Sequence, residues 1–268
     1  MIAKPDDSAG LSNRIKCIVN AMYQADKNNT NLSLNWNKSF VCGANYHDLF
    51  TYPIVQTKDT TGIVINTYEF PKISKKKILS YLNKLKIKKE ITNEADYFFN
   101  KKLHTNAIVI GVHVRRTDFR YNSYKNKNSD ELYFKRMDEM IENNPEIYFF
   151  IATDSKKTEN EFIKRYGGRI IIYPKKEFDK ESANGVKEAF IELLILSKCN
   201  HILGSYLSTF SELAYWYGGC KGIEYIGKPK GEVINIKDRK SSFLGNLNQF
   251  MYKNFKLYRL GLKKLGYW

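Results

Sequence analysis

Short apolar runs alternate with amphipathic stretches throughout the second half of the chain. Runs rich in Ile, Val and Phe are typical of strands buried in a parallel sheet, and apolar residues spaced three and four apart are typical of helices that face a core. The pattern predicts strands at 107–114, 147–152, 169–172, 199–203 and 222–226, and helices at 130–142, 186–198 and 209–217, with a polar helix that ends at 166. Strands that alternate with helices indicate βαβ units and a parallel sheet.

The first half of the chain has a weaker pattern. Its clearest element is a predicted helix over 15–25, whose apolar positions follow helical spacing: Ile15, Ile18, Val19, Met22 and Ala25. A short strand is predicted at 32–36, short β-like pieces at 40–72, and two basic helices near 74–89 and 93–103. We therefore predict a smaller α/β domain over residues 1–105, a Rossmann-like domain over 106–242, and a C-terminal helix over 243–268.

Composition allows this organisation and adds a strong positive charge. The chain has 268 residues, 43% of them hydrophobic, which is enough for one large core or two modest ones. It carries 44 Lys and Arg against 28 Asp and Glu, a net charge of +16. The charge fits an anionic partner, such as a nucleic acid, an acidic lipid headgroup or a nucleotide-linked substrate. It fits equally a coding bias that enriches Lys, Asn and Ile without a functional cause.

The cysteines and the apolar stretches narrow the class of protein. Cys17, Cys42, Cys199 and Cys220 lie far apart and lack the Cys-x-x-Cys spacing of zinc and redox sites, so we expect reduced thiols and no metal site. The sequence contains no stretch of 18 uncharged apolar residues, and its first residues lack the apolar region of a signal peptide. We therefore expect a cytoplasmic protein.

The segment Gly111-Val-His-Val-Arg-Arg-Thr-Asp118 carries the strongest chemical signal. It continues the apolar run 107–110, so Arg115 and Arg116 come where a strand leaves the sheet. Ligands of open α/β sheets bind at the carboxyl ends of the strands, and each guanidinium is a planar fork of donors that matches a pair of phosphate oxygens. The alternatives are a diphosphate site and a solvated turn with a local Arg–Asp pair. His113 alternates with two valines and fits either a core histidine or a ligand contact.

Two further segments carry carboxylates at informative places. Asp154 follows the predicted strand 147–152, where it fits either an ordinary helix N-cap or a group that holds an arginine or a sugar hydroxyl. Glu188 and Glu192 share one face of an otherwise apolar helix. They fit either an exposed face or a paired, functional carboxylate, because a buried carboxylate is costly without a partner.

Small hydroxyl residues lie between a predicted strand and the helix 209–217, in the run Gly204-Ser-Tyr-Leu-Ser-Thr-Phe-Ser211, whose first part, 204–208, is predicted to be a turn. Ser208 or Thr209 is the expected N-cap, and Glu212 the acid of the first turn. Backbone N–H groups at a helix N-terminus favour an anion. Together with the arginine pair on the same sheet edge, this run indicates an anion site.

The predicted helix 243–268 mixes basic residues with aromatic and aliphatic ones at helical spacing. One interpretation is an anchor on an anionic membrane surface, which suits an enzyme that acts on a lipid-linked glycan. The other is a terminal helix that packs back onto the fold.

These segments, in this order, resemble the GDP-fucose-dependent fucosyltransferase superfamily. The stretch His113–Asp118 is similar to its His-x-Arg-Arg-x-Asp motif, most closely in the α1,6 group and also in bacterial α1,2 enzymes. The stretch Ala9–Arg14 resembles a glycine-asparagine loop near the start of several members, and Leu193–Ala214 resembles a third motif.

The resemblance implies a GT-B architecture, with two Rossmann-like domains that face each other across a cleft. It also implies an inverting, metal-independent transfer of L-fucose from GDP-β-L-fucose to a hydroxyl of a glycan, with no cofactor, in the synthesis of a bacterial surface polysaccharide or oligosaccharide. By motif position, Arg115 and Arg116 would hold the β-phosphate and neighbouring groups, and Asp118 would brace that loop or the donor. The implied donor-binding residues are Asn13, Arg14, His113, Asp154, Glu192, Ser208 and Thr209.

One departure from the pattern concerns the base. Some α1,6 members carry a Glu shortly after the arginine motif, whereas Phe119–Tyr124 contains no carboxylate here. Asp118, Asp130 and Glu131 are the remaining candidates. Three other functions stay open: a transferase for another GDP-sugar, an inactive fold that binds a glycan or nucleotide, and a basic nucleic-acid-binding protein. The last lacks any recognisable nucleic-acid motif, so we expect no nucleic acid as partner.

Overall fold

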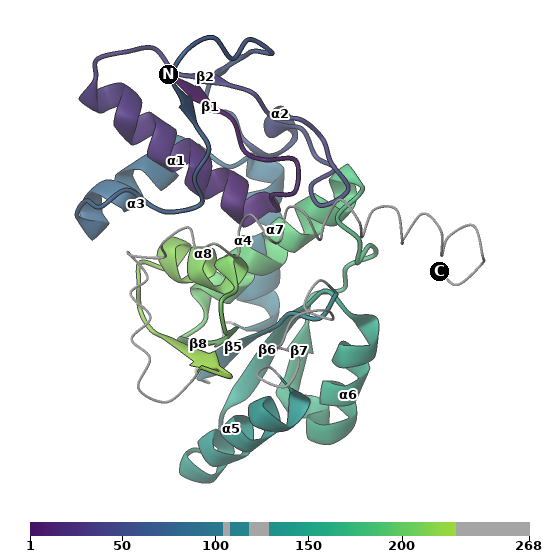
Figure 1. Cartoon of the computed structure of the whole chain (residues 1–268). Coiled ribbons are helices and arrows are strands. Elements are labelled where there is room, and N and C mark those ends of the chain that lie inside the picture. Colours follow the sequence, from purple (N-terminus) through teal and green to yellow (C-terminus); the bar gives the residue numbers. More distant parts are fainter. Residues whose placement is uncertain (104–107, 118–128, 229–268) are drawn as a thin grey trace. The chain divides into compact units, whose positions relative to one another are not determined.

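The computed structural model describes residues 1–103, 108–117 and 129–228 (Figure 1). They fall into two compact units whose segments alternate along the chain. Among the described residues, the first unit contains 1–41 and 54–73, and the second contains 42–53 and 74–228.

The first unit is a small parallel sheet with one long helix. Its strands are β1 (Ile2–Ala3), β2 (Ser33–Leu34), β3 (Val55–Gln56) and β4 (Val64–Ile65), in the order β3-β2-β1-β4 with every pair parallel. The helix α1 (Leu11–Lys27) confirms the prediction for 15–25 and extends it at both ends. Its predicted apolar face is buried, which explains why this segment forms a helix despite its polar residues.

The second unit contains a five-stranded parallel sheet, as the sequence predicts. The strands are β5 (Val109–Val114), β6 (Tyr148–Thr153), β7 (Ile170–Ile172), β8 (His201–Ser205) and β9 (Ile223–Ile226), in the order β7-β6-β5-β8-β9. The central strand β5 is buried along its whole length. This burial explains its continuous apolar run, because a strand covered on both faces has no polar side.

Helices cover both faces of this sheet. The helices of this unit are α2 (Tyr46–Leu49), α3 (Lys75–Lys84), α4 (Lys89–Lys102), α5 (Asp130–Asn143), α6 (Lys156–Tyr166), α7 (Ala183–Lys198) and α8 (Thr209–Tyr217), with a short 3₁₀ turn, η2 (Gly167–Arg169). Figure 1 shows α5 and α6 on one side of the sheet and α4, α7 and α8 on the other. The side chains of β5 alternate accordingly: Val112 and Val114 face the core under α5 and α6, whereas Gly111 and His113 face α7 and α8.

Three of these helices begin after a serine N-cap whose side chain accepts a backbone N–H group. Ser74, Ser155 and Ser182 accept N–H groups from the first turns of α3, α6 and α7, which satisfies donors that the helix leaves unpaired. At its other end α6 stops at Gly167, whose φ of 54° favours glycine, as the sequence predicts.

Two details differ from the sequence-based expectation. The predicted turn at 204–208 is wrong at its start, because Gly204 and Ser205 belong to β8 and pair with Tyr225 and Ile226 of β9. Helices α3 and α4, which the predicted limit at residue 105 assigns to the N-terminal domain, are part of the second unit. There α4 packs along α7, and α3 contacts α8. The predicted helix 243–268 and the limit at residue 242 lie outside the described residues and stay predictions.

Gly204 provides a test of how closely β8 and α8 pack. A Cβ on Gly204 would lie 2.7 Å from the Cβ of Ser211 in α8, whereas a Cβ on Gly168 would meet nothing within 4 Å. We expect Gly204→Ala to lower the free energy of unfolding by about 1–3 kcal/mol, the usual cost of overpacking. Gly168→Ala should change it by no more than about 0.5 kcal/mol. Urea denaturation measures both, and equal midpoints for the two variants would contradict this packing.

Candidate functional site

The strands β5 and β8 end side by side at the middle of the second sheet. From β5 the chain proceeds outward through β6 to β7, and α7 then returns it to β8 on the other side of β5. Strand order therefore reverses between β5 and β8, and open α/β sheets bind ligands outside the carboxyl ends of their strands at such a point. Arg115 and Arg116 follow β5, and Ser208 and Thr209 follow β8. The reversal thus brings two predicted groups to one place.

Hydrogen bonds join the two strand ends directly. The backbone N–H of Arg115 donates to Ser205 Oγ over 2.9 Å, and that hydroxyl lies 3.0 Å from the carbonyl oxygen of His113. The hydroxyl of Tyr133, from α5, is 3.0 Å from the same carbonyl and 2.8 Å from Ser205 Oγ. Burial raises the pKa of Tyr133, so it stays a neutral donor. We call residues 115–117, which follow β5, the arginine loop. The base of this loop is therefore held from β8 and from α5.

The Arg116 side chain is held at the same edge. Its guanidinium forms an ion pair with Asp130, the first residue of α5, and lies 5.9 Å from the centroid of the Tyr133 ring. A carboxylate is favoured at this helix N-terminus, so α5 stabilises Asp130 in its place beside Arg116. Arg115 and Arg116 are both partly exposed, and ligands can therefore reach them. Asp118 lies outside the described residues.

Asp154 shapes the arginine loop from the neighbouring strand end. Its carboxylate accepts the N–H of Arg116 at 2.8 Å and the N–H of Thr117 at 3.1 Å, and it also accepts the Thr117 hydroxyl. The cap of α6 is Ser155 and not Asp154. Of the two interpretations of Asp154, the structure thus favours the one in which it holds an arginine, through backbone N–H groups.

His113 points into the interior of the unit. Its Nδ1 lies 2.7 Å from Ser211 Oγ, and its ring stacks on Phe210 with the centroids 4.6 Å apart. The residue is 6% exposed. It therefore ties β5 to the first turn of α8, as a satisfied core histidine does, and its expected part in donor binding stays a prediction.

Glu192 is buried and paired, not exposed. Both of its carboxylate oxygens lie within 2.9 Å of the ammonium of Lys175, whose side chain is itself 3% exposed. Burial raises the pKa of Glu192 to about 7, although the nearby Lys175 opposes this shift. The other carboxylate of this helix face, Glu188, accepts the backbone N–H groups of Lys176 and Glu177. The exposed-face interpretation of this pair is wrong.

The N-terminus of α8 faces the edge where the arginines lie. Ser208 is its N-cap, as predicted, and Glu212 stands in its first turn. Ser208 Oγ is fully buried and meets no hydrogen-bond partner among the residues that the structure describes. The preceding Leu207 has a φ of 62°, a left-handed conformation that non-glycine residues adopt at a cost. The first N–H groups of α8 have no partner within the helix and favour an anion at this edge, whereas the Ser208 hydroxyl is enclosed by protein.

Asn13 and Arg14 lie in α1 of the first unit. Arg14 is fully buried and donates to the carbonyl oxygens of Ala9 and Asn37 and to the hydroxyl of Ser39, over 2.6–2.9 Å. Its guanidinium thus binds together the loops around α1. Asn13 Oδ1 is buried and has no hydrogen-bond partner within the described part of the chain. A role of either residue in donor binding stays a prediction.

Three residues of this edge escaped the sequence analysis. Tyr133 reads as one more apolar position of a helix, and Ser205 as part of a turn. Lys175 follows the last residues of β7, so the rule that ligands gather at carboxyl strand ends could have drawn attention to it. Its burial, and its pairing with a residue 17 positions away, could not be read from the pattern.

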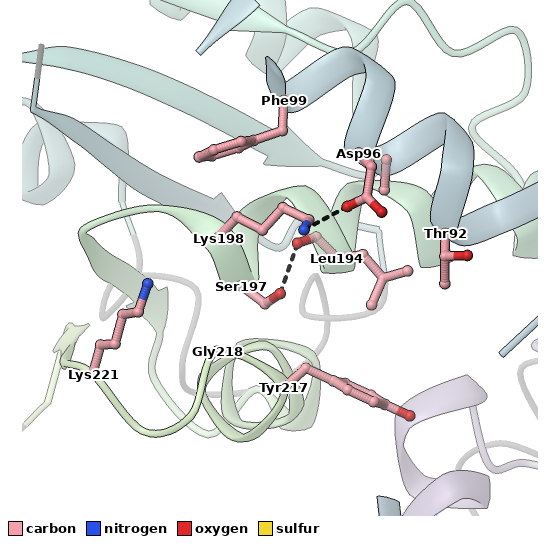
Figure 2. A pocket seen from close by; sticks show the side chains of 10 residues that line it. Thr92, Asp96, Phe99, Leu194, Ser197, Lys198, Tyr217, Gly218 and Lys221 are labelled. Atoms are coloured by element: carbon pink, nitrogen blue, oxygen red, sulfur yellow. Dashed lines mark hydrogen bonds and ion pairs between the residues drawn. The ribbon is translucent and has the colours of Figure 1, made fainter. Parts of the chain in front are cut away.

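A hollow of about 460 Å³ lies elsewhere in the second unit, between α4, α7 and the end of α8 (Figure 2). Its walls include Phe99, Lys198 and Lys221, and the ammonium of Lys198 is paired with Asp96 over 2.6 Å. Lys198 and Lys221 precede β8 and β9, so the hollow lies toward the amino ends of these strands. It is therefore separate from the carboxyl edge of the sheet, where Arg115 and Arg116 lie.

No group of three or more His, Cys, Asp or Glu side chains suited to a metal occurs within residues 1–103, 108–117 and 129–228. In the same part of the chain, no helix has the length and apolar character needed to cross a membrane.

Known proteins resemble this chain in structure and not detectably in sequence. No protein-family model and no curated protein matches it. The crystal structure of NodZ α-1,6-fucosyltransferase soaked with GDP-fucose matches with a TM-score of 0.57 and 15% identity, over 81% of this chain and 91% of NodZ. A structure of fucosyltransferase NodZ from Bradyrhizobium gives 0.56 and 15%, over 80% and 90%. POFUT1 in complex with GDP-fucose gives 0.59 and 12%, over 85% and 98%.

At this level of identity the likeness establishes the fold. It extends over four fifths of this chain and nearly the whole of the compared chains. It therefore includes both parallel sheets and is larger than one Rossmann-like motif. The chain therefore has the α/β fold of these fucosyltransferases, and the GT-B fold class predicted from the sequence is confirmed.

Proposed function

We propose that this protein is a glycosyltransferase that moves L-fucose from GDP-β-L-fucose to a hydroxyl of a glycan acceptor, with inversion and without a metal ion. One observation carries the proposal: the paired arginines after β5 and the N-terminus of α8 meet where strand order reverses, and the bond from Arg115 to Ser205 joins them. The fold supports it, because NodZ and POFUT1 structures contain GDP-fucose or GDP.

The chemistry of the reaction explains why two arginines suit this place. As fucose departs with oxocarbenium character, negative charge accumulates on the diphosphate. Donors that are already oriented toward that charge usually make the largest contribution to catalysis. In the proposal, Arg115 and Arg116 and the N–H groups after Ser208 supply them in place of a divalent cation. The ion pair with Asp130 keeps Arg116 in position before the donor arrives.

The remaining predicted residues have more indirect roles in this proposal. Asp154 braces the arginine loop through the N–H groups of Arg116 and Thr117. Thr209 contributes the first helical N–H of α8, and Glu192 lies behind the loop with its carboxylate on Lys175. The base that accepts the acceptor's proton is not assigned, since Asp130 is engaged with Arg116. A dissociative transition state makes a strong base less necessary.

The first prediction concerns the donor. Because a ligand that binds only the folded state stabilises it, GDP at 100 times its Kd should raise the stability by about 2.7 kcal/mol. We expect GDP and GDP-fucose to raise the melting temperature, with EDTA present or absent, whereas UDP and CMP-sugars should not. GDP-mannose is the control for the sugar. Because the phosphate contacts are common to both donors, a difference between the shifts with GDP-fucose and with GDP-mannose reports on the sugar alone. A shift only with UDP, or only with added metal, would contradict the proposal.

The second prediction concerns the arginines. We expect Arg115→Ala and Arg116→Ala each to slow donor turnover by roughly 10²–10³-fold, the scale for the loss of one charge-stabilising donor. Arg116→Lys should recover little, because a point charge does not replace the planar fork. Arg165→Ala is the matched control, since this arginine of α6 is exposed and paired with Asp138. Hydrolysis of GDP-fucose, followed with and without acceptor, measures the rates; wild-type rates in both alanine variants would refute the assignment.

The third prediction concerns the acceptor side. We propose that residues 243–268 bind an anionic membrane surface, where a lipid-linked glycan would be presented. The support is the sequence alone, which places Lys253, Lys256 and Arg259 among aromatic residues at helical spacing. Co-sedimentation with vesicles of anionic and of neutral lipid should show binding of the full chain to the anionic ones only. A chain that ends at Ser242 should lose it, and unchanged binding after truncation would exclude this anchor.

A further inference from the structure

Lys175 is a buried cation at the carboxyl edge of the second sheet. Its side chain is 3% exposed, and its ammonium lies 2.8–2.9 Å from both carboxylate oxygens of Glu192 and 3.6 Å from Glu159 Oε1. Phe178 covers it, with the ring centroid 4.4 Å from Nζ. A buried ammonium is tolerated only when its hydrogen bonds are satisfied, and here two carboxylates and an aromatic face surround it.

The third hydrogen bond of Lys175 does not go to a charge. The ammonium also donates to the carbonyl oxygen of Thr153, the last residue of β6. The next residue is Asp154, whose carboxylate accepts the N–H groups of Arg116 and Thr117. One peptide unit therefore separates the bond made by Lys175 from the side chain that shapes the arginine loop.

The segment that carries Lys175 is itself firmly held. The carboxylate of Glu188 accepts the N–H groups of the two residues after Lys175, over 2.8–3.0 Å. Asp179 accepts the N–H groups of Glu181 and Ser182, and a Cβ on Gly185 would lie 2.0 Å from the Asp179 carbonyl oxygen. A lysine on such a segment can hold its partners in place, because its own backbone has little freedom to follow them.

We propose that Lys175 is a positioning residue of the donor site: it fixes the peptide between Thr153 and Asp154, and through Asp154 it sets the conformation of Arg116 and Thr117. The chain of contacts crosses three adjacent strand ends, from β7 to β6 to β5. This inference rests on the proposed function only for its consequence, which is donor affinity. The positioning itself can be measured without any ligand.

The competing explanation is that Lys175 only balances buried charge. Two carboxylates, Glu192 and Glu159, face its ammonium, and a second cation, Lys156, pairs with Glu159 at 2.8 Å. Asp154 is in turn 3.6 Å from the ammonium of Lys180. If charge balance were the whole role, removal of Lys175 and of one facing carboxylate together would restore every property of the site. The positioning role requires that the loop stay altered, because the carbonyl of Thr153 still lacks its donor.

The test compares Lys175→Met, the charge-balanced double variant Lys175→Met with Glu192→Gln, and the control Lys176→Met, whose exposed side chain is next in sequence. Hydrogen–deuterium exchange of the full chain without ligand reads the amides of Arg116 and Thr117. We expect these amides to exchange about tenfold faster in both variants that lack Lys175, and at the wild-type rate in the control. The double variant should recover most of the melting temperature, so a loss of fold does not explain the change.

GDP affinity, measured by calorimetry, then connects the loop to the donor. We expect Lys175→Met to weaken GDP binding by about tenfold. This is the lower end of the effect on metal affinity when a residue that hydrogen-bonds a metal-ligating side chain is mutated. Unchanged exchange at Arg116 and Thr117 in the double variant would overturn the positioning role, whatever GDP does. Altered exchange in a protein whose wild type binds no GDP would instead support the positioning and refute the proposed function.

Discussion

The backbone N–H of Arg115 donates to the hydroxyl of Ser205, and the candidate site depends on this contact. It joins the ends of the two strands between which strand order reverses, so a residue after β5 and a helix after β8 share one location. Tyr133 adds a second hydrogen-bonding hydroxyl from α5, and both hydroxyls lie within 3.0 Å of the carbonyl oxygen of His113. Three segments that are distant in sequence thus fix one turn of backbone.

Charge at this edge is arranged in layers. The outermost groups are the arginine side chains, which remain partly exposed. Behind them Asp130 pairs with Arg116, and Asp154 accepts two backbone N–H groups. Deeper still lie Glu192 and Lys175, almost without contact with water. Carboxylates therefore hold the loop that carries the two arginines from within.

Two of the residues that the sequence predicts for donor binding, Arg14 and His113, have their hydrogen bonds to other parts of the fold. Arg14 uses its guanidinium to connect the backbone at Ala9 with Asn37 and Ser39, and His113 stacks on Phe210 and lies within hydrogen-bond distance of Ser211. Both are buried polar groups with satisfied hydrogen bonds, which are the common state of such residues in a core. A motif position alone does not separate a residue that touches a ligand from one that keeps its neighbour in place.

The sequence by itself determined the parallel sheet, its five strands, the helices between them and the arginine pair at a strand end, because apolar periodicity and local capping are properties of short segments. It could not determine that Gly204 and Ser205 continue β8, since that depends on pairing with β9. Nor could it show that Asp154 bonds to the arginine loop through backbone N–H groups, or that Lys175 is the partner of Glu192. Those contacts join residues up to 38 positions apart, and only the packing of strand ends at one edge decides which groups meet.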